Sequence, residues 1–381
     1  MLSRFCAGFA GLGLIASAAC TVTPAAAATE VCGTFTLATE WTAHDSPYLV
    51  TGDIFIPATS RLRIGPGVTV KFAKPRPCEL EKTEIEQKDW ADSMYTGIKA
   101  EGTFYVLGTD EQPVIFEPEN AKPGVIGWDG LRLEGQKAGA AEISFAEFHG
   151  ANQAVTAEKS GFFIHHCLFQ GNNTGIWAGF RADLGIVNCD FIGNVSAGLV
   201  IRKASPRIAN NLFAANRAYG IWADARPSIQ TWNNAFWQNR EQACYKCPYA
   251  VLDTSKTNAN GDASDAFGNL IADPIFVGSP SHDLAREADV AEPTPAHLVK
   301  DPQLAKLEAE AAEKAAAKEK KSKKKKKREY EPLGKGPFVL SKYSKLIDAG
   351  SGRKEFKDRD GSRNDIGLHG GPMGRIASDP F

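Results

Sequence analysis

The chain has 381 residues, of which 43% are hydrophobic and 23% are charged, and its formal net charge is −1. This length allows two or three ordinary domains or one elongated repeat domain. Residues 301–330 carry eleven Lys and Arg against six Asp and Glu, which leaves 33 basic and 39 acidic residues elsewhere, a balance of −6. The composition therefore excludes a uniformly basic body and predicts a basic segment attached to a mildly acidic one.

Residues 1–28 are predicted to be an export signal. Arg4 is followed by FCAGFAGLGLIASAA, an apolar run of small residues that is too short for a stable membrane-spanning helix. SAAC resembles a bacterial lipobox, which would make Cys20 a lipidated first residue, whereas AAAATE offers cleavage near Ala28. Both routes stay open, and both predict a protein of the bacterial cell envelope (periplasm or outer membrane) or of the extracellular space.

The body is predicted to span residues 29–297, with an insertion at 74–95. The inserted sequence, KPRPCELEKTEIEQKDWADSMY, contains prolines and many charges that break the strand pattern around it. Such a segment is typical of a surface excursion between two structural units.

A unit of about 22 residues recurs through the middle of the body. When the units are aligned on one phenylalanine each, the steps are 21, 22, 22 and 23 residues, and the aligned residues are Phe148, Phe169, Phe191, Phe213 and Phe236. An asparagine column contains Asn172, Asn194, Asn216 and Asn239, and an isoleucine column contains Ile143, Ile164, Ile186 and Ile208. The G-I-x triplets fall into the same register, which is the mark of a unit that stacks on copies of itself.

The unit is too short for a helical hairpin repeat of 33 or more residues, and its apolar residues are β-branched or aromatic at strand spacing. Each copy reads I-x-x-N/C-x-F, then Asn, then G-I-x, so short strands alternate with turns in which Asn and Gly tolerate a positive φ. Parallel pairing between copies about 4.8 Å apart would stack identical columns. The sequence therefore predicts an all-β parallel solenoid of about eight to ten coils, with the aligned phenylalanines stacked inside.

Several segments resemble a known family. They are SPYLVTGDIFIPATSRLRIGPGVTVKF with a turn at Pro66-Gly67, GTFYVLGTDEQPVIF, GWDGLRLEG, DPIFV, LIDAG and DRDGSRNDIGLHGGP. From about Tyr48 to Met373 the chain resembles the right-handed parallel β-helix repeat proteins of bacterial envelopes. The resemblance implies a right-handed parallel β-helix but no single activity, because that scaffold hosts lyases, hydrolases, epimerases and noncatalytic surface proteins.

After the leader, six cysteines remain: Cys32, Cys78, Cys167, Cys189, Cys244 and Cys247. Export permits disulfides, and about 15 pairings are open. Cys167 and Cys189 occupy equivalent positions in adjacent coils, where Cα atoms about 4.8 Å apart would fit a disulfide. We favour a reduced, buried pair that continues the asparagine ladder represented by Asn211, because free cysteine buries readily.

The Cys244-x-x-Cys247 motif has no second pair and no thioredoxin-like pattern around it, so it is weak evidence for a metal site or for redox chemistry. Cys244 falls in the inward column of Ile176 and Ile221, which predicts a structural role.

The third residue of each G-I-x triplet should face outward. This column contains Arg132, Thr156, Trp177, Val200, Trp222 and Tyr245. Trp177 and Trp222 would lie two coils apart, about 10 Å, and exposed aromatics at regular spacing suit stacking against sugar rings. The alternative is that the inserted helix or the C-terminal segment covers this strip, because large apolar patches are seldom left bare.

Enzymes on this scaffold display outward carboxylates, with calcium and a basic residue for β-elimination or as a pair for glycoside hydrolysis. The candidates here are Arg181, Asp183, Arg202, Lys203, Asp224 and Arg226. Arg202 and Asp224 fall at the same offset in adjacent coils, which predicts an exposed salt bridge. The predicted carbohydrate-binding residues are Trp177, Trp222, Tyr245, Arg202 and Asp224. We find no carboxylate pair at equivalent positions of neighbouring coils, so no catalytic residue is assigned.

Residues 298–332 are predicted to be a Lys-rich helical insertion. Asp301-Pro302 suits a helix start, and QLAKLEAEAAEKAAAKEK favours a solvated helix. From Lys318 to Arg328 there are nine basic residues against one acidic, and the proposed polyanion contacts are Lys323, Lys324, Lys325, Lys326, Lys327 and Arg328. Export favours lipopolysaccharide, another envelope polyanion or an anionic membrane surface over any specific nucleic acid, and the alternative is a merely solvated tract.

The segment 333–381 is predicted to close the domain. Asp358, Asp360 and Asp365 in KDRDGSRND resemble half of a calcium loop, but the bidentate glutamate of an EF-hand is missing. A turn rich in Asp and Gly is the favoured interpretation, and calcium is the one metal considered.

Taken together, these features predict an exported monomer, either free or lipid-anchored through Cys20, that binds envelope or extracellular polysaccharide without transforming it. The alternatives are a polysaccharide lyase, hydrolase or epimerase on the same scaffold, and a structural or adhesive surface protein.

Overall fold

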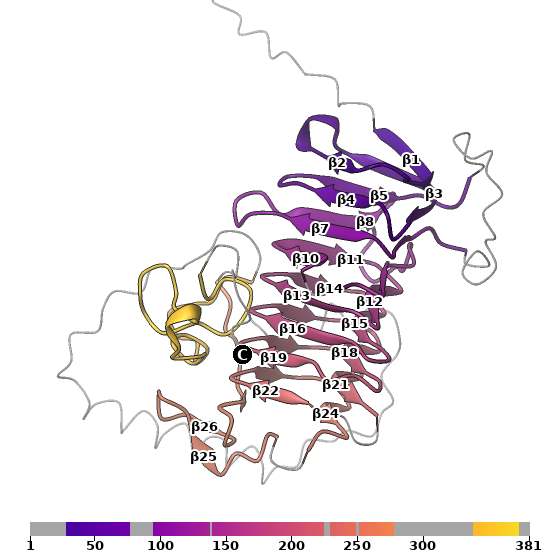
Figure 1. Cartoon of the computed structure of the whole chain (residues 1–381). Coiled ribbons are helices and arrows are strands. Elements are labelled where there is room, and N and C mark those ends of the chain that lie inside the picture. Colours follow the sequence, from indigo (N-terminus) through magenta and orange to yellow (C-terminus); the bar gives the residue numbers. More distant parts are fainter. Residues whose placement is uncertain are drawn as a thin grey trace, which may run out of the picture.

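The structure, a computed structural model, describes residues 28–76, 94–137, 139–224, 229–248, 251–277 and 338–372. These residues form a parallel β-solenoid in which each coil contributes one strand to an eight-stranded sheet, so the solenoid has eight coils (Figure 1). The prediction of a parallel β-solenoid of about eight to ten coils is confirmed at the lower bound.

Three ladders of parallel strands run along the solenoid. The first ladder contains β2 (Thr39–Trp41), β4 (Arg61–Ile64), β7 (Thr103–Leu107), β10 (Ala141–Ser144), β13 (Gly161–His165), β16 (Asp183–Val187), β19 (Arg207–Ala209) and β22 (Gln230–Trp232). The second contains the first half of β3 (Tyr48–Ile56), β5 (Thr69–Phe72), β8 (Val114–Pro118), β11 (Ala146–His149), β14 (Leu168–Gln170), β17 (Asp190–Ile192), β20 (Leu212–Ala214), β23 (Ala235–Trp237) and β27 (Leu270–Ile271). The third contains the second half of β3, β6 (Ile98–Ala100), β9 (Leu131–Glu134), β12 (Gln153–Glu158), β15 (Thr174–Ala178), β18 (Ala197–Ile201), β21 (Tyr219–Ala223) and β24 (Gln242–Tyr245).

The remaining elements lie at the ends of the solenoid or outside the ladders. β1 (Thr29–Thr34) pairs in parallel with β3, and β25 (Lys256–Thr257) pairs antiparallel with β26 (Ala263–Ser264). Two 3-10 helices, η1 (Ala43–Asp45) and η3 (Lys354–Phe356), complete the list of described elements. Within the described residues, no helix is long and apolar enough to cross a membrane.

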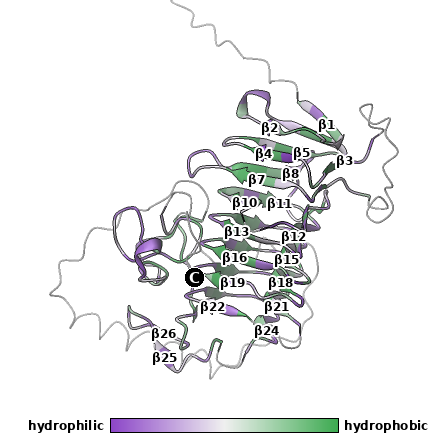
Figure 2. Cartoon of the chain, viewed as in Figure 1, coloured by the Kyte–Doolittle hydropathy of each residue, from purple (hydrophilic) through white to green (hydrophobic). Residues whose placement is uncertain are grey.

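The interior is built around a column of phenylalanine rings. The five aligned phenylalanines are fully buried, and successive ring centroids lie 4.7 to 5.1 Å apart with nearly parallel planes. Phe116 extends the column by one coil, 4.9 Å from Phe148. The predicted phenylalanine stack is therefore confirmed, and hydrophobic residues concentrate on the strands of the ladders (Figure 2).

Asparagines satisfy the backbone at the turns that follow β14, β17, β20 and β23 of the second ladder. The Asn194 side-chain amide donates to the Phe169 carbonyl (3.0 Å) and to Asn216 Oδ1 (2.9 Å), and its own Oδ1 accepts from the Asn172 amide (3.1 Å). Because a buried polar group without partners is costly, the same residue type recurs at this position in four successive coils.

The glycine of the repeated triplet is required by close packing. A Cβ on Gly198 would lie 2.9 Å from each of three atoms: the Gly220 carbonyl oxygen, the Phe191 Cβ and the Phe213 ring carbon Cδ1. The opening of the triplet therefore has to be a residue without a side chain wherever neighbouring coils approach this closely.

The C-terminal segment, residues 338–372, packs against the outside of the second ladder (Figure 1). Its apolar contacts run from Leu340, Leu346 and Ile366 to Leu168 and Leu212 of the ladder. The segment resembled a domain-closing element in sequence, and in the structure it covers the second ladder from β14 to β27.

Three predicted regions fall outside the described residues. These are the leader with Cys20, most of the insertion at 74–95, and the Lys-rich helix at 298–332. The described strands extend from Thr29 to Ile271, inside the predicted body of 29–297.

Candidate functional site

The outward column predicted on the third ladder exists. Pairing in register joins the six residues through neighbouring strands, in the order Arg132, Thr156, Trp177, Val200, Trp222, Tyr245, and Lys99 precedes them in β6. The alignment of these positions is confirmed. Their role in binding sugar stays a prediction.

Four aromatic side chains gather at the C-terminal coils of this ladder. The Trp222 and Tyr245 rings are nearly parallel with centroids 6.1 Å apart, and the Tyr219 ring lies 5.2 Å from Tyr245. We call Trp177, Tyr219, Trp222 and Tyr245 the aromatic strip. Tyr219 was missed in the sequence because it stands before the repeat glycine, where the residue type changes from coil to coil.

The strip is partly exposed. Both tryptophans and both tyrosines are half-buried, whereas Val200, which lies between Trp177 and Trp222 in register, is only 5% exposed. The described contacts of the C-terminal segment include the second ladder, the turn that precedes it, Asp110 and the loop between β25 and β26, and none of these lies on the third ladder. The C-terminal segment, one of the two covers considered for the strip, is therefore placed elsewhere. The inserted helix, the other cover, lies outside the described residues.

Two cations border the aromatic rings. The Arg202 guanidinium lies 5.6 Å from the Trp177 ring centroid, and the Lys246 ammonium lies 5.1 Å from that of Tyr245. Asp224 accepts a hydrogen bond from the Lys203 amide (2.9 Å). Among the ion pairs between described residues, none joins Arg202 to Asp224, so the expected salt bridge gains no support.

The N-terminal coils of the same ladder carry charges instead of aromatics. Glu134 pairs in register with Glu158, and Lys99 Nζ bridges Glu101 (3.2 Å) and Glu134 (3.1 Å). The sequence-based statement that neighbouring coils hold no carboxylate pair at equivalent positions is therefore wrong. The column of Arg132 and Thr156 already sets this register, because Glu134 and Glu158 each stand two residues further along their strands, and the pair was overlooked there.

Both carboxylates of this pair have structural partners. Glu158 accepts a hydrogen bond from the Phe180 amide (2.9 Å) across the next turn, and Glu134 lies 3.9 Å from the Arg132 side chain. Carboxylates held in this way orient their neighbours and fix a turn.

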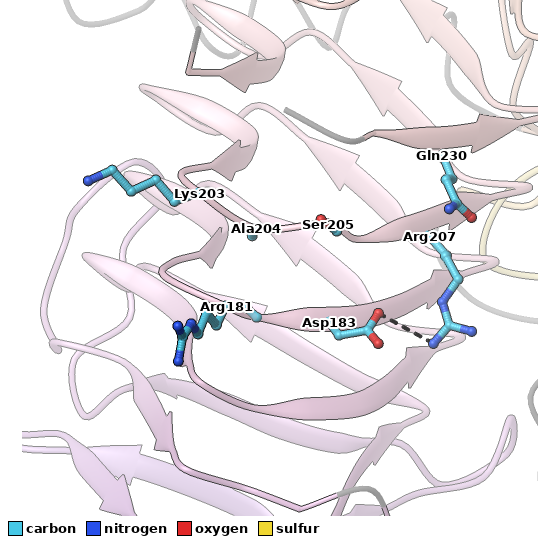
Figure 3. Close-up of a pocket in the computed structure, with 8 residues that line it drawn as sticks. Arg181, Asp183, Lys203, Ala204, Ser205, Arg207 and Gln230 are labelled. Carbon is cyan, nitrogen blue, oxygen red and sulfur yellow. Dashed lines mark ion pairs between the residues drawn. The ribbon is translucent and has the colours of Figure 1, made fainter. Parts of the chain in front are cut away.

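A cavity of about 590 Å³ opens at the corner between the third and first ladders (Figure 3). Its lining residues are Arg181, Ala182, Asp183, Lys203, Ala204, Ser205, Arg207 and Gln230. In Figure 3, Arg181 and Lys203 extend from one side of the corner, and Asp183 and Arg207 face each other on the other side in a 3.5 Å ion pair. Three predicted outward candidates, Arg181, Asp183 and Lys203, thus come together here, while Arg226 lies outside the described residues.

Cys167 and Cys189 are free and fully buried, as predicted. The Cys189 amide donates to Asn211 Oδ1 (2.9 Å), so the cysteines continue the asparagine ladder. Burial raises the pKa of the Cys189 thiol well above its ordinary value. The Cys189 thiol is consequently a poor nucleophile and a poor metal ligand.

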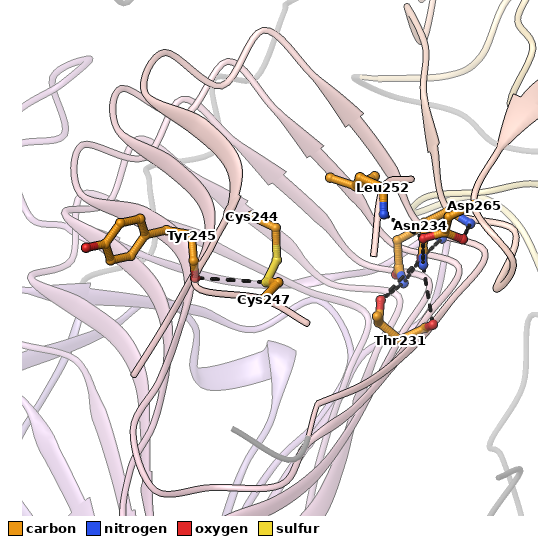
Figure 4. The surroundings of a disulfide bond; sticks show 8 residues. Thr231, Asn234, Cys244, Tyr245, Cys247, Leu252 and Asp265 are labelled. Atoms are coloured by element: carbon orange, nitrogen blue, oxygen red, sulfur yellow. Dashed lines mark hydrogen bonds between the residues drawn. A yellow bond between two sulfur atoms is a disulfide. The ribbon is translucent and has the colours of Figure 1, made fainter. Parts of the chain in front are cut away.

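Cys244 and Cys247 form a disulfide (Figure 4). Cys244 pairs in register with Ile221, and both cysteines pack against the hydrophobic core at the last coil. The inward position of Cys244 is confirmed, and Figure 4 shows the disulfide with Tyr245 pointing away from it. Cys32 is also disulfide-bonded.

The C-terminal segment docks through buried polar groups. His166 shares a hydrogen bond with the Gly370 carbonyl (2.9 Å), and the Asn188 side-chain amide donates to the Gly367 carbonyl (3.0 Å). The Leu368 amide donates to Asp190 (2.9 Å). Burial, followed by the neighbouring His165, lowers the pKa of His166 to about 3, and burial raises the pKa of Asp190 to about 7.

The three aspartates considered for calcium are occupied by the chain itself. Asp358 accepts from the Asp365 amide (3.0 Å), Asp365 from the Asp348 amide (2.7 Å), and Asp360 from the Ser362 amide (2.9 Å). In the part of the chain that the structure describes, no group of three or more His, Cys, Asp or Glu is placed to hold a metal ion. These contacts fit the Asp and Gly turn, and a calcium site stays a prediction.

Residues 123–261 match the family model described as a right handed beta helix region. This region is a right-handed β-helix. The match runs from the turn before β9 to the loop between β25 and β26, so it contains the aromatic strip and the corner cavity. No curated protein and no solved structure matches the chain significantly.

Proposed function

We propose that this protein is exported and that its β-helix binds envelope or extracellular polysaccharide along the third ladder without transforming it. The observation that carries this proposal is the aromatic strip, in which four half-buried rings lie on one face with Arg202 and Lys246 at their edges. Aromatic faces stack on the apolar faces of sugar rings, and cations beside them supply hydrogen-bond donors to hydroxyl groups.

The spacing of the strip suits a chain of sugars. Trp177 and Trp222 lie two strands apart in register, which is about 10 Å. A glycan that runs parallel to the solenoid axis would present every second ring to a tryptophan, and the buried Val200 would form the floor between them.

The test is retention of an immobilised glycan panel by the purified protein and by two matched variants. Trp222→Ala removes a ring of the strip, and Trp232→Ala removes a half-buried ring from the first ladder. We expect Trp222→Ala to weaken retention by about tenfold with little change in melting temperature. One stacked ring contributes at most about 1.5 kcal/mol of binding free energy in addition to the burial of its apolar surface. Trp232→Ala should retain glycan normally; equal retention by Trp222→Ala and the parent would refute the proposal.

A second candidate function is glycoside hydrolysis, which the register pairing of Glu134 with Glu158 favours. Carboxylates on adjacent strands can lie about 5 Å apart, as in retaining glycosidases. The same panel, scored for release of reducing or unsaturated ends, separates the two functions. Release that disappears in Glu134→Gln would establish catalysis in place of simple binding.

We further propose that Lys323–Arg328 contacts an anionic envelope surface, because nine cations within Lys318–Arg328 attract polyanions strongly at low salt. Deleting residues 309–328 should leave the β-helix stable and abolish salt-sensitive binding to anionic vesicles or lipopolysaccharide. Unchanged vesicle binding by the deletion variant would contradict this role.

A further inference from the structure

A column of cations follows the turn between the third and first ladders. Lys159, Arg181 and Lys203 stand in this turn in three successive coils, and each has a positive φ, between 50° and 55°. The Lys159 amide donates to the Phe180 carbonyl (2.8 Å) and the Arg181 amide to the Lys203 carbonyl (3.0 Å), so the three turns stack. All three side chains are exposed. We call these residues the cation column.

The fold itself does not require cations at these positions. A positive φ suits Gly, Asn and Asp better than long side chains. Like charges at stacked positions about 4.8 Å apart repel one another. A repeated unfavourable choice at an exposed site is the kind of observation from which a functional role is inferred.

The surroundings of the column are positively charged overall. Arg202 and Arg207 lie beside it, whereas the nearby carboxylates have partners: Glu158 binds the Phe180 amide, Asp183 pairs with Arg207, and Asp224 binds the Lys203 amide. Five cations therefore stand against three engaged carboxylates. The small residues Ala182 and Ala204 also line this cavity, and their short side chains leave it open.

We propose that the cation column binds the anionic groups of an acidic polysaccharide whose chain runs along the solenoid axis, with one charged sugar residue per coil. The inference rests on the proposed function above and names its ligand class. Its geometric basis is the common spacing: one cation per coil at about 4.8 Å is on the order of one sugar residue. Trp177 lies in the same coil as Arg181, and Arg202 lies over Trp177, so one glycan can meet both surfaces.

The shared ligand chemistry is an oxyanion on each sugar, either a carboxylate or a sulfate. The probes are therefore polygalacturonate, its fully methyl-esterified form, a sulfated galactan and an oligothymidylate. The variant Lys159→Gln/Arg181→Gln/Lys203→Gln removes the column. Its control, Lys122→Gln/Lys256→Gln/Lys354→Gln, removes the same charge from three separate exposed sites.

Affinities are measured at about 50 mM and about 200 mM salt, because binding by charge weakens as salt rises. We expect the parent and the control to bind an acidic glycan at least about tenfold more tightly than the ester, and the column variant to lose that preference. Carboxylate and sulfate sources are distinguished by which acidic polymer binds.

Equal binding of acidic polymer by the column variant and the control would overturn the inference, as would tighter binding of oligothymidylate than of every glycan. If Trp222→Ala loses ester binding while the column variant does not lose acidic preference, the inference fails and the proposed function stands. If the parent binds none of the glycans, both fail. Matching melting temperatures of the two triple variants show that neither result comes from misfolding.

Discussion

Replacing Phe191 by Ala should be among the most damaging single changes in the body of the solenoid. Its ring is fully buried between Phe169 and Phe213, with centroids 4.9 and 4.7 Å away and planes within 5°. A buried Phe→Ala change costs about 3 to 5 kcal/mol of unfolding free energy. The loss should lie in the upper part of that range, because the backbones of Gly175 and Gly198 line the ring and have no side chain that could move into the void.

The assay is chemical denaturation followed by tryptophan fluorescence, with a matched control. Phe180→Ala deletes the same atoms from a side chain that is 42% exposed, and we expect it to cost less than about 1 kcal/mol. Because a solenoid can unfold coil by coil, hydrogen exchange should show whether the loss centres on β17 and its neighbours. Similar costs for the two variants, or a cost below about 1 kcal/mol for Phe191→Ala, would refute the stacked interior.

Three further predictions concern the polar groups and cysteines. Asn194→Leu should destabilise the fold by about 2 kcal/mol or more in the same denaturation assay, since it takes the side-chain partner away from the buried Asn172 backbone amide and from the Phe169 carbonyl; a neutral result would show that the ladder is dispensable. Burial raises the folded-state pKa of Asp358 to about 7 and of Asp365 to about 8, so their contribution is complete below about pH 4 and is lost as the pH rises through these values. Asp190, which accepts from the Leu368 amide and has its pKa raised to about 7, acts in the same sense, whereas His166, with its pKa lowered to about 3, acts in the opposite sense below its ordinary value of 6.5. Protease resistance of the C-terminal segment should therefore fall as the pH rises from about 4 to about 8; Asp365→Asn should flatten that fall. In the native protein, Cys167 and Cys189 should not react with thiol reagents until the chain unfolds. A mild reductant should open the Cys244–Cys247 disulfide before the chain unfolds. Labelling of Cys189 in the folded protein would contradict its burial.

The interior could be predicted from the sequence because each coil solves the same packing problem. Coils of the same cross-section each require a large ring in the interior, an amide side chain at the turn and a residue without a side chain where the coils approach closely. These requirements produce the columns that contain Phe191, Asn194 and Gly198. Cys189 could be assigned to the asparagine ladder for the same reason, since its position in the coil is shared with Asn211.

The outer surface could be predicted where the strands share one register. The column of Arg132 and Thr156 fixes the register of β9 and β12, so the pairing of Glu134 with Glu158, two residues further along each strand, was predictable from the sequence as well. The docking of the C-terminal segment was not, because the contact between Asn188 and Asn364 spans 176 residues and follows no period.

The position of the candidate site follows from how each outer face of the solenoid is composed. The outward residues of the second ladder include Leu168, Ile192 and Leu212, which are almost fully buried because the C-terminal segment lies over them. On the third ladder the corresponding positions hold aromatic rings with polar edges and charged groups, which tolerate water on one side and apolar contact on the other. An aliphatic face has to be covered by the chain itself, whereas an aromatic and cationic face can stay in contact with water when no ligand is bound. The same solenoid thus separates a face that completes the fold from a face that is free to bind.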